Sequence, residues 1–324
     1  MHVAAGASLS KLVSIVVPFY NEEKNVDRLF DRLNPLLERL SNYQFEVICV
    51  DDGSSDKTLQ NLIDRAQHDR RIRVVELSRN FGKEAALTAG LDQSSGQAAI
   101  PIDADLQDPP EVIERMLPLW EAGAEVVLAK RVDRHSDSFA KRKTAEFFYK
   151  LHNRVSSTRI PENVGDFRLL DRAAVNAIKA LPEQHRFMKG LFAWIGFNTA
   201  TVEYRRDPRA SGATKFSGWK LWNFAIEGLT SFSSTPLKLW SYIGIVGSLL
   251  SFLYASFIIV RTLFYGVDVP GYASLLVVVL FLGSLQLIAL GLLGEYIGRI
   301  YDESKRRPIY IVRKIHMRKS IGSE

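Results

Sequence analysis

Acidic residues follow three apolar runs of this chain, and they are its residues best suited to chemistry. The three segments are Pro18-Phe-Tyr-Asn-Glu-Glu, Asp51-Asp-Gly-Ser-Ser-Asp and Asp103-Ala-Asp-Leu-Gln-Asp. In an Asp-x-Asp sequence on extended backbone, both carboxylates project on the same side. Such oxygens suit Mg²⁺ or Mn²⁺, and Mg²⁺ is often held by one or two carboxylates together with substrate phosphates. The pattern therefore indicates a metal-assisted site for a nucleoside diphosphate.

Each acidic segment also has a simpler interpretation when it is taken alone. Asp56 and Asp108 fit helix caps better than metal ligands, and Asp51-Asp-Gly could be only a turn. A lone Asp-x-Asp sequence often occurs by chance. The combination is stronger, because strand ends of one parallel sheet face a common cleft.

Other kinds of site are not supported by the sequence. There is no P-loop, and no Gly-x-Gly-x-x-Gly follows the first apolar run, so neither an NTPase nor a dinucleotide oxidoreductase is indicated. The six histidines lack ligand spacing, and a single cysteine, Cys49, excludes a disulfide scaffold or a thiolate metal site. The 18 Phe, 11 Tyr and 5 Trp exclude a disordered chain.

The elements that must position these acids alternate between strand and helix. Apolar runs rich in β-branched residues predict buried parallel strands, and amphipathic segments between them predict helices. The alternation through about residue 130 predicts a doubly wound α/β sheet. The predicted strands are 13–19, 45–50, 72–77, 98–102, 126–129 and 199–204, with later helical patterns at 139–155, 172–181 and 187–195.

Two long apolar runs near the carboxyl end predict membrane spans. Residues 239–260 and 269–294 are uncharged runs of 22 and 26 residues, and each can cross the hydrocarbon layer of roughly 30 Å. A pair of buried core helices is the alternative. The segment 216–232 places aromatic and aliphatic residues at helical spacing, which fits a helix in the membrane interface or one packed on the soluble domain.

The distribution of charge predicts how the spans are oriented. The net charge is +6, and residues 295–324 contain eight basic and four acidic side chains. Loop 266–272 has no Lys or Arg, so the positive-inside rule places the carboxyl-terminal tail in the cytoplasm. Two spans then place the amino-terminal domain there too. Since the basic excess lies mainly beside the membrane, no nucleic-acid partner is expected.

Four motifs, in this order, resemble those of the family 2 polyprenyl-phosphate glycosyltransferases, which are GT-A-fold relatives of dolichol-phosphate mannose synthase. They are the three acidic segments, the last extended by Pro109-Pro, and Arg79-Asn-Phe-Gly-Lys. With two carboxyl-terminal spans, the chain is most similar to the bacterial bactoprenol glucosyltransferase branch that serves O-antigen glucosylation. The resemblance covers nearly the whole chain and implies a Rossmann-like GT-A domain that binds a nucleotide sugar.

The reaction implied by the resemblance is inverting transfer of a single sugar to undecaprenyl phosphate, dependent on Mg²⁺ or Mn²⁺. UDP-glucose is the favoured donor, while UDP-N-acetylglucosamine, UDP-galactose, GDP-mannose and a 4-amino-4-deoxyarabinose donor stay open. The product would be a lipid-linked monosaccharide for cell-surface glycan modification. The resemblance further implies an integral protein of the bacterial inner membrane, with its catalytic domain and both termini in the cytoplasm.

The resemblance also assigns roles to individual residues. Nucleotide-sugar binding is expected of Pro18, Tyr20, Glu22, Asp52, Lys83 and Asp103; metal binding of Asp103, Asp105 and Gln107; catalysis of Asp105 and Asp166; and lipid-phosphate binding of Arg206, Arg209 and Lys215. Asp166 would orient the acceptor or donor, or act as a base. Gly212-Ala-Thr-Lys departs from the family's frequent Gly-x-Ser-Lys/Arg, which leaves the register of the two arginines open. A solvated basic loop attracted to anionic lipid is the alternative for this segment.

The predicted organisation has six parts. They are a cytoplasmic GT-A domain (1–215), an amphipathic interfacial helix (216–238), transmembrane helices (239–265 and 273–298) joined by an external loop (266–272), and a basic cytoplasmic tail (299–324). Small residues in the spans, such as Gly244 and Gly283, could pack against neighbouring helices, so a homo-oligomer stays open.

Two other functions fit the sequence less well. A processive polysaccharide synthase would share the fold, but its usual Gln-x-x-Arg-Trp motif is replaced by Gln184-His-Arg-Phe, and two spans are too few for a pore. A catalytically inactive, membrane-anchored nucleotide-sugar-binding or scaffold protein is disfavoured because Asp103, Asp105 and Asp166 are all present.

Overall fold

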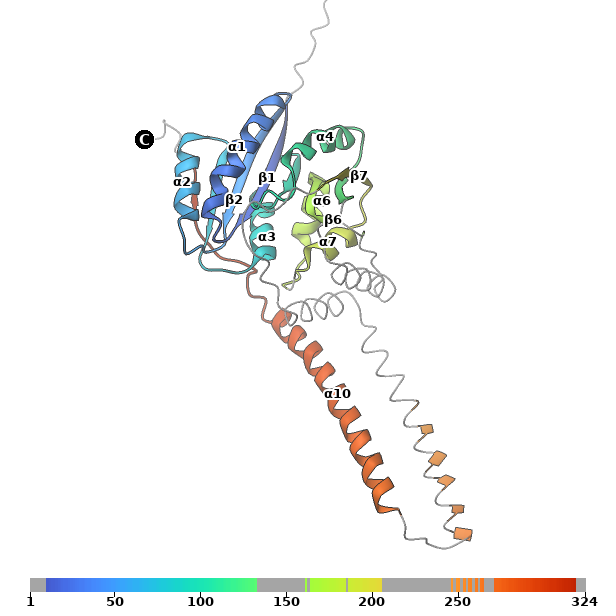
Figure 1. Ribbon diagram of the computed structural model, residues 1–324. Coiled ribbons are helices and arrows are strands. Elements are labelled where there is room, and N and C mark those ends of the chain that lie inside the picture. Colours follow the sequence, from blue (N-terminus) through green and yellow to red (C-terminus); the bar gives the residue numbers. More distant parts are fainter. Residues whose placement is uncertain are drawn as a thin grey trace, which may run out of the picture.

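An eight-stranded sheet forms the centre of the protein, as seen in a computed structural model that describes residues 10–132, 161, 164–184, 186–205, 271–318 and scattered positions from 246 to 264. The strand order is β7-β5-β6-β4-β1-β2-β3-β8. Helices cover both faces of the sheet, and one long helix extends away from it (Figure 1).

The strands are β1 (Lys11–Phe19), β2 (Tyr43–Asp51), β3 (Ile72–Leu77), β4 (Ala98–Pro101), β5 (Val126–Arg131), β6 (Val164–Asp171), β7 (Thr199–Tyr204) and β8 (Val312–His316). The helices are α1 (Glu23–Arg39), α2 (Thr58–His68), α3 (Lys83–Gln93), the 3₁₀ helix η1 (Pro110–Val112), α4 (Ile113–Glu121), α6 (Arg172–Ala180), α7 (Met188–Trp194) and α10 (Tyr272–Ser304).

The central strands are parallel and buried on both faces, which explains why their sequences are continuously apolar. Successive side chains of a strand point to opposite faces. Ile15 and Val17 of β1 join the core formed with α1, α2 and α4, whereas Val16 joins the core formed with α3, α6 and α7. The sheet is therefore the middle layer of a three-layer α/β domain.

The predicted strands are confirmed, and two further strands were not expected from the sequence. β6 lies between β4 and β5 and is antiparallel to both. β8 comes from the segment that the sequence analysis treated only as a basic tail, and it pairs antiparallel with β3 at the edge of the sheet. The helical pattern at 139–155 lies outside the described residues.

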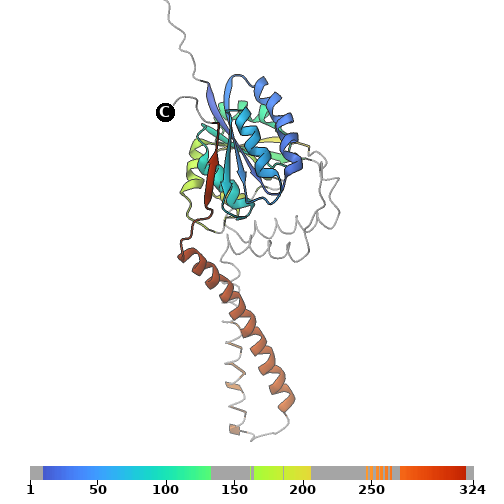
Figure 2. The same ribbon diagram turned by 90° about the vertical axis from the view of Figure 1, so that its left-hand side faces the viewer.

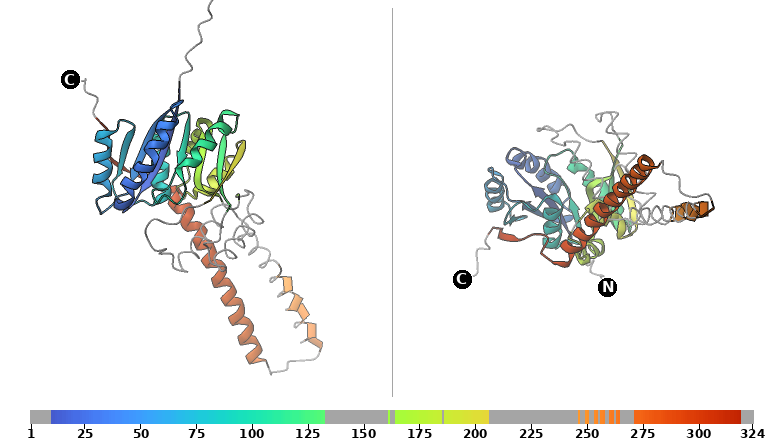
Figure 3. Two further views of the ribbon diagram at one scale, coloured as in Figure 1. Left: turned by 45° about the horizontal axis from the view of Figure 1, so that its top comes forward. Right: turned by 90° about the horizontal axis from the view of Figure 1, so that it is seen from below.

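Helix α10 corresponds to the second predicted span. It contains 33 residues and is therefore about 50 Å long. Among the described residues it holds the one stretch that is long and apolar enough to cross a membrane, Phe281–Ser304, with a mean hydropathy of 1.4. Its carboxyl end lies beside the sheet domain and its amino end lies far from it (Figures 1 and 3).

The first predicted span, 239–265, lies only partly within the described residues. The described positions between 246 and 264 are helical, and their large apolar side chains are exposed. The predicted interfacial helix, 216–238, lies outside the described residues.

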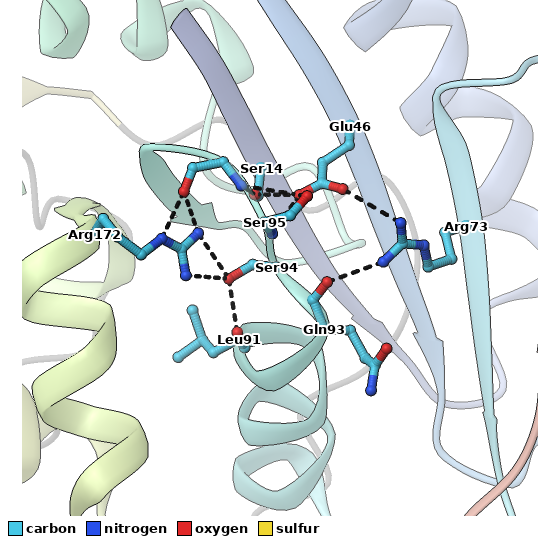
Figure 4. A network of polar contacts seen from close by, with 9 residues as sticks. Ser14, Glu46, Arg73, Leu91, Gln93, Ser94, Ser95 and Arg172 are labelled. Atoms are coloured by element: carbon cyan, nitrogen blue, oxygen red, sulfur yellow. Dashed lines mark hydrogen bonds and ion pairs between the residues drawn. The ribbon is translucent and has the colours of Figure 1, made fainter.

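A polar network anchors the loop between α3 and β4 to the start of the sheet (Figure 4). Oε1 of Glu46 accepts hydrogen bonds from Ser14 Oγ at 2.6 Å and from the Ser95 amide at 2.7 Å. Arg172 donates to the carbonyl of Gly96 at 2.7 Å through Nε. Burial opposes ionisation of Glu46, but the hydrogen bonds from Ser14 and Ser95 outweigh it and lower the pKa of this carboxyl.

Glu46→Gln should lower the thermal unfolding midpoint by several degrees, or about 1–2 kcal/mol, because charge-assisted hydrogen bonds become neutral ones. Differential scanning fluorimetry of the purified protein in detergent measures the shift. The control is Glu38→Gln, which changes an exposed carboxyl. Equal midpoints for the two variants would contradict this account of the network.

Candidate active site

A cavity of about 740 Å³ opens at the carboxyl ends of β1, β2 and β4. Parallel strands bring segments distant in sequence to this edge of the sheet. Seven residues predicted from the sequence line the cavity: Pro18, Tyr20, Glu22, Asp52, Lys83, Asp103 and Asp105. Asn80, Gly82 and Ala104, which lie within the quoted motifs without an assigned role, also line it, as does Ala86, which no motif contains.

The turn after β1 is locked against the turn after β2. Asn21 has a φ of 54°, a left-handed conformation that asparagine tolerates well. Its amide donates to Ser54 Oγ at 3.0 Å, and its side-chain oxygen accepts from the Ser55 amide at 2.8 Å. The adjacent Tyr20 is 49% exposed, which leaves its ring available to stack on a planar ligand.

Asp52 connects the end of β2 to the loop between β3 and α3. Its two carboxylate oxygens accept hydrogen bonds from the Phe81 amide at 2.7 Å and the Gly82 amide at 2.9 Å. Burial raises the pKa of Asp52 even though both amide hydrogen bonds lower it. The carboxyl therefore shapes the cavity wall in addition to lining the cavity.

Lys83 joins two carboxylates from different parts of the sheet. Its ammonium lies 2.7 Å from Asp103 Oδ1 and 2.8 Å from Asp166 Oδ2. Burial would lower the pKa of Lys83, but the two carboxylates raise it, so the ammonium stays charged. Burial would likewise raise the pKa of Asp166, and the nearby ammonium groups of Lys83 and Lys189 lower it below its usual range. Asp166 is thus held as a carboxylate beside the cavity.

Two further buried titratable groups, Glu84 and Arg168, interact with Asp166 and were not predicted from the sequence. Burial and the neighbouring Asp166 raise the pKa of Glu84 to about 8, so this carboxyl keeps its proton at neutral pH. Arg168 is buried, lies 4.0 Å from the ring centroid of Phe192, and has a pKa lowered by burial to about 10. The available signal was position in the sequence: Glu84 follows Lys83, and Arg168 shares a strand face with Asp166.

The segment after Asp103 is more tightly folded than the sequence suggested. Leu106 has a φ of 56°, and Asp105 Oδ1 accepts a hydrogen bond from the Gln107 amide at 3.1 Å. Gln107 is buried and is not among the residues that line the cavity, so its role as a metal ligand stays a prediction.

Neither proposed capping acid is the N-cap residue of the following helix. Asp108 accepts a hydrogen bond from Tyr204 Oη at 2.5 Å, and η1 begins at Pro110 with Pro109 as its N-cap. Asp56 does accept from the Thr58 amide at the start of α2, but it also accepts from the Glu23 amide and so bridges two helices. The basic residues predicted to bind lipid phosphate, Arg206, Arg209 and Lys215, lie outside the described residues.

The donor set of the cavity suits a divalent cation that is shared with a ligand. Asp103 and Asp105 both line the cavity and supply hard oxygen ligands. The described residues contain no group of three His, Cys, Asp or Glu side chains able to hold a metal ion. An ion bound by Asp103 and Asp105 would leave coordination positions for water or for phosphates of the substrate, as Mg²⁺ commonly does.

Comparison with known proteins identifies the family. The model of glycosyl transferase family 2 matches residues 14–179, which include every described candidate site residue. The chain belongs to this family. It is a glycosyltransferase, and its three-layer sheet domain has the Rossmann-like α/β architecture of the GT-A fold. A second model, the GtrB C-terminal hairpin, matches residues 235–300.

Several relatives align with nearly the whole glycosyltransferase. An uncharacterized glycosyltransferase of Synechocystis sp. is 56% identical over 93% of this chain and 94% of its own. The SfII prophage-derived bactoprenol glucosyl transferase of Shigella flexneri is 53% identical over 94% of this chain and 98% of its own. A prophage bactoprenol glucosyl transferase homolog of Escherichia coli is 50% identical over 94% of this chain and 99% of its own.

Replacing Lys83 with methionine should destabilise the glycosyltransferase by a few degrees at neutral pH, and less at acid pH. A carboxyl whose folded pKa is lowered, such as Asp166, contributes stability above its unfolded pKa and loses that contribution as pH falls through its folded pKa. Without the ammonium this contribution shrinks, so the wild type and the variant should converge in acid.

Unfolding midpoints measured between about pH 3 and pH 8 test this expectation. Lys24→Met, at an exposed lysine of α1, is the matched control. A deficit of Lys83→Met that is the same at every pH would show that the ammonium does not act through a carboxylate.

Proposed function

We propose that this glycosyltransferase transfers a single sugar, with glucose favoured, from UDP-glucose to undecaprenyl phosphate at the cytoplasmic face of the bacterial inner membrane. The observation that carries the proposal is the acid-lined cavity, which opens on the side of the domain where β1 ends and from which α10 extends (Figure 1). A site in this position is open to a soluble nucleotide sugar and adjacent to a lipid acceptor.

The relatives support both substrates. Two of them are named bactoprenol glucosyl transferases or their homologues, and their alignments include the carboxyl-terminal hairpin as well as the catalytic domain. Bactoprenol is a polyprenol, so the acceptor class follows from this similarity together with the apolar helix α10. Glucose as the sugar is supported by the relatives' names. UDP as its carrier is supported by the family resemblance alone.

The residues of the cavity suggest how transfer proceeds. A divalent cation on Asp103 and Asp105 would neutralise charge on the departing diphosphate. A phosphate monoester with a second pKa near 6 is largely dianionic at neutral pH and needs little help from a base. Asp166, held ionised by Lys83, would therefore orient a substrate rather than take a proton. Direct displacement at the anomeric carbon inverts its configuration.

Arg206, Arg209 and Lys215 remain the proposed ligands of the acceptor phosphate. A guanidinium group can donate two parallel hydrogen bonds to phosphate oxygens, whereas an ammonium group binds phosphate as a point charge. Along the chain their segment follows β7, whose last residue, Tyr204, donates a hydrogen bond to Asp108 of the Asp103–Asp108 loop.

The course of the chain supports two membrane crossings. β7 ends within the sheet domain, whereas α10 begins at its distant end, about 50 Å from its carboxyl end. If α10 crosses the membrane, residues 205–271 must cross it in the other direction. β8 then returns the chain to the sheet, so the tail and the catalytic domain lie on the same side of the membrane. The basic tail makes that side the cytoplasm.

Transfer is tested by incubating the purified protein with UDP-[labelled glucose], undecaprenyl phosphate and Mg²⁺ or Mn²⁺, followed by extraction with organic solvent. Label should enter the lipid phase, and EDTA should prevent this until excess metal is restored. Asp105→Asn should reduce transfer by at least about 100-fold, the scale of losing one group that stabilises transition-state charge. Asp64→Asn, at an exposed aspartate of α2, is the control and should retain activity.

A panel of labelled nucleotide sugars distinguishes the possible outcomes of this assay. Label that stays aqueous with every donor would overturn the enzymatic function, and binding of UDP-glucose without transfer would favour the inactive nucleotide-sugar-binding protein. Transfer from a different donor would correct only the sugar.

The proposed topology is tested with a membrane-impermeant maleimide. Cys49 is the single cysteine and is fully buried, so the native chain should not react. Val267→Cys should be labelled from outside intact cells, and Met317→Cys only in inverted membrane vesicles. Labelling of both positions from the same side would show that α10 does not cross the membrane and would overturn the proposed topology.

A further inference from the structure

The segment after α10 is attached to the catalytic domain at several separate points. The Gln184 amide donates to Glu303 Oε1 at 2.9 Å, at the end of α10. Tyr310 Oη donates to Asp92 Oδ2 at 2.7 Å, near the end of α3. β8 then pairs with β3 along the edge of the sheet, where it is the red strand in Figure 2. The membrane helix is therefore continuous with an edge strand of the catalytic sheet.

Additional contacts join the tail to the chain where β3 ends. The amide of Ser78 donates to the carbonyl of Ile311 at 2.9 Å, and the carbonyl of Ser78 accepts from Arg313 Nη2 at 2.8 Å. The same guanidinium pairs with Glu76 at 3.2 Å, and His316 Nε2 lies 2.9 Å from the other oxygen of Glu76. Both backbone groups of Ser78 are thus bound by the tail.

Ser78 leads directly into a wall of the donor cavity, the loop 79–82. This loop lies tightly against the turn after β2, since a Cβ at Gly53 would lie 2.6 Å from the backbone of Arg79 and Asn80. Its last two amides bind Asp52, and Asn80 and Gly82 line the cavity. A displacement of Ser78 would therefore move the cavity wall.

Lys83, the first residue of α3, continues this connection to the acids of the site. The Lys83 ammonium bridges Asp103 and Asp166. Because Lys83 directly follows loop 79–82, the position of this ammonium depends on the position of the loop. An unbroken series of contacts then runs from the tail through Ser78, Asp52 and Lys83 to the reacting region.

We propose that β8, acting through Arg313, is a positioning element for donor binding: it fixes loop 79–82 and thereby couples the membrane helix to the nucleotide-sugar cavity. Arg313 does not line the cavity and would not touch the substrate. The identity of the donor rests on the proposed function. The planar Arg313 guanidinium can fix the loop because its two terminal nitrogens bind the Glu76 carboxylate and the Ser78 carbonyl at the same time.

Steady-state kinetics of Arg313→Ala test the proposal. The KM for UDP-glucose should rise roughly tenfold, as expected for loss of a charge-assisted hydrogen bond, while the KM for undecaprenyl phosphate stays unchanged. Arg313→Lys should recover only part of the affinity, because an ammonium can keep the pairing with Glu76 but lacks the fork. Arg318→Ala, at an exposed position of the same tail, is the matched control.

Amide hydrogen exchange gives a second readout that needs no activity. Exchange of residues 79–82 should accelerate in Arg313→Ala, while the strand interiors of β1 and β4 stay protected. An unchanged donor KM, unchanged exchange in this loop, or an equal rise in both KM values would overturn the proposal. If the wild type transfers no sugar at all, the proposed function fails, and the exchange of loop 79–82 still decides whether Arg313 positions it.

Discussion

The ammonium group of Lys83, which lies between two carboxylates, is the constraint on which the site depends. Asp103 follows β4 and Asp166 lies on β6, and both reach the same lysine, Lys83. Without a cation between them, two carboxylates in a partly enclosed space would repel each other, and one would take up a proton. Lys83 supplies that cation and holds Asp166 as a carboxylate, and Arg168 is a further buried cation that lowers the pKa of Asp166.

The same arrangement explains why the sheet departs from a purely parallel pattern. β6 runs against β4 and β5, and this direction brings Gly165 and Asp166, near the start of β6, to the edge where the parallel strands end. A parallel strand in the same place would present its carboxyl end there instead. Reversing one strand thus adds an acid to a site that is otherwise built from strand ends and loops.

The sequence was sufficient for those parts of the fold that depend on local pattern. The apolar run around Val16 and the acids at Asp52 and Asp103 predicted strands and a ligand edge, because periodicity and strand-end position are local properties. The pairing of Lys83 with Asp166 was not predictable from pattern, since the two residues are joined only by the register of distant strands. β8 escaped detection because Val312 and Ile315 are separated by two basic residues and lack the every-second-residue alternation of a half-buried strand.

The carboxyl-terminal strand also has a consequence for how copies of this protein behave beside one another. An uncovered β3 would present a row of unpaired amides and carbonyls along an apolar strand, which is a template for pairing with another chain. Proteins anchored in one membrane share an orientation and a height, so their exposed sheet edges would meet far more often than in free solution. By occupying that edge with a strand that carries Arg313 and Lys314, the chain covers β3 with its own tail, and such charged edge strands disfavour edge-to-edge pairing.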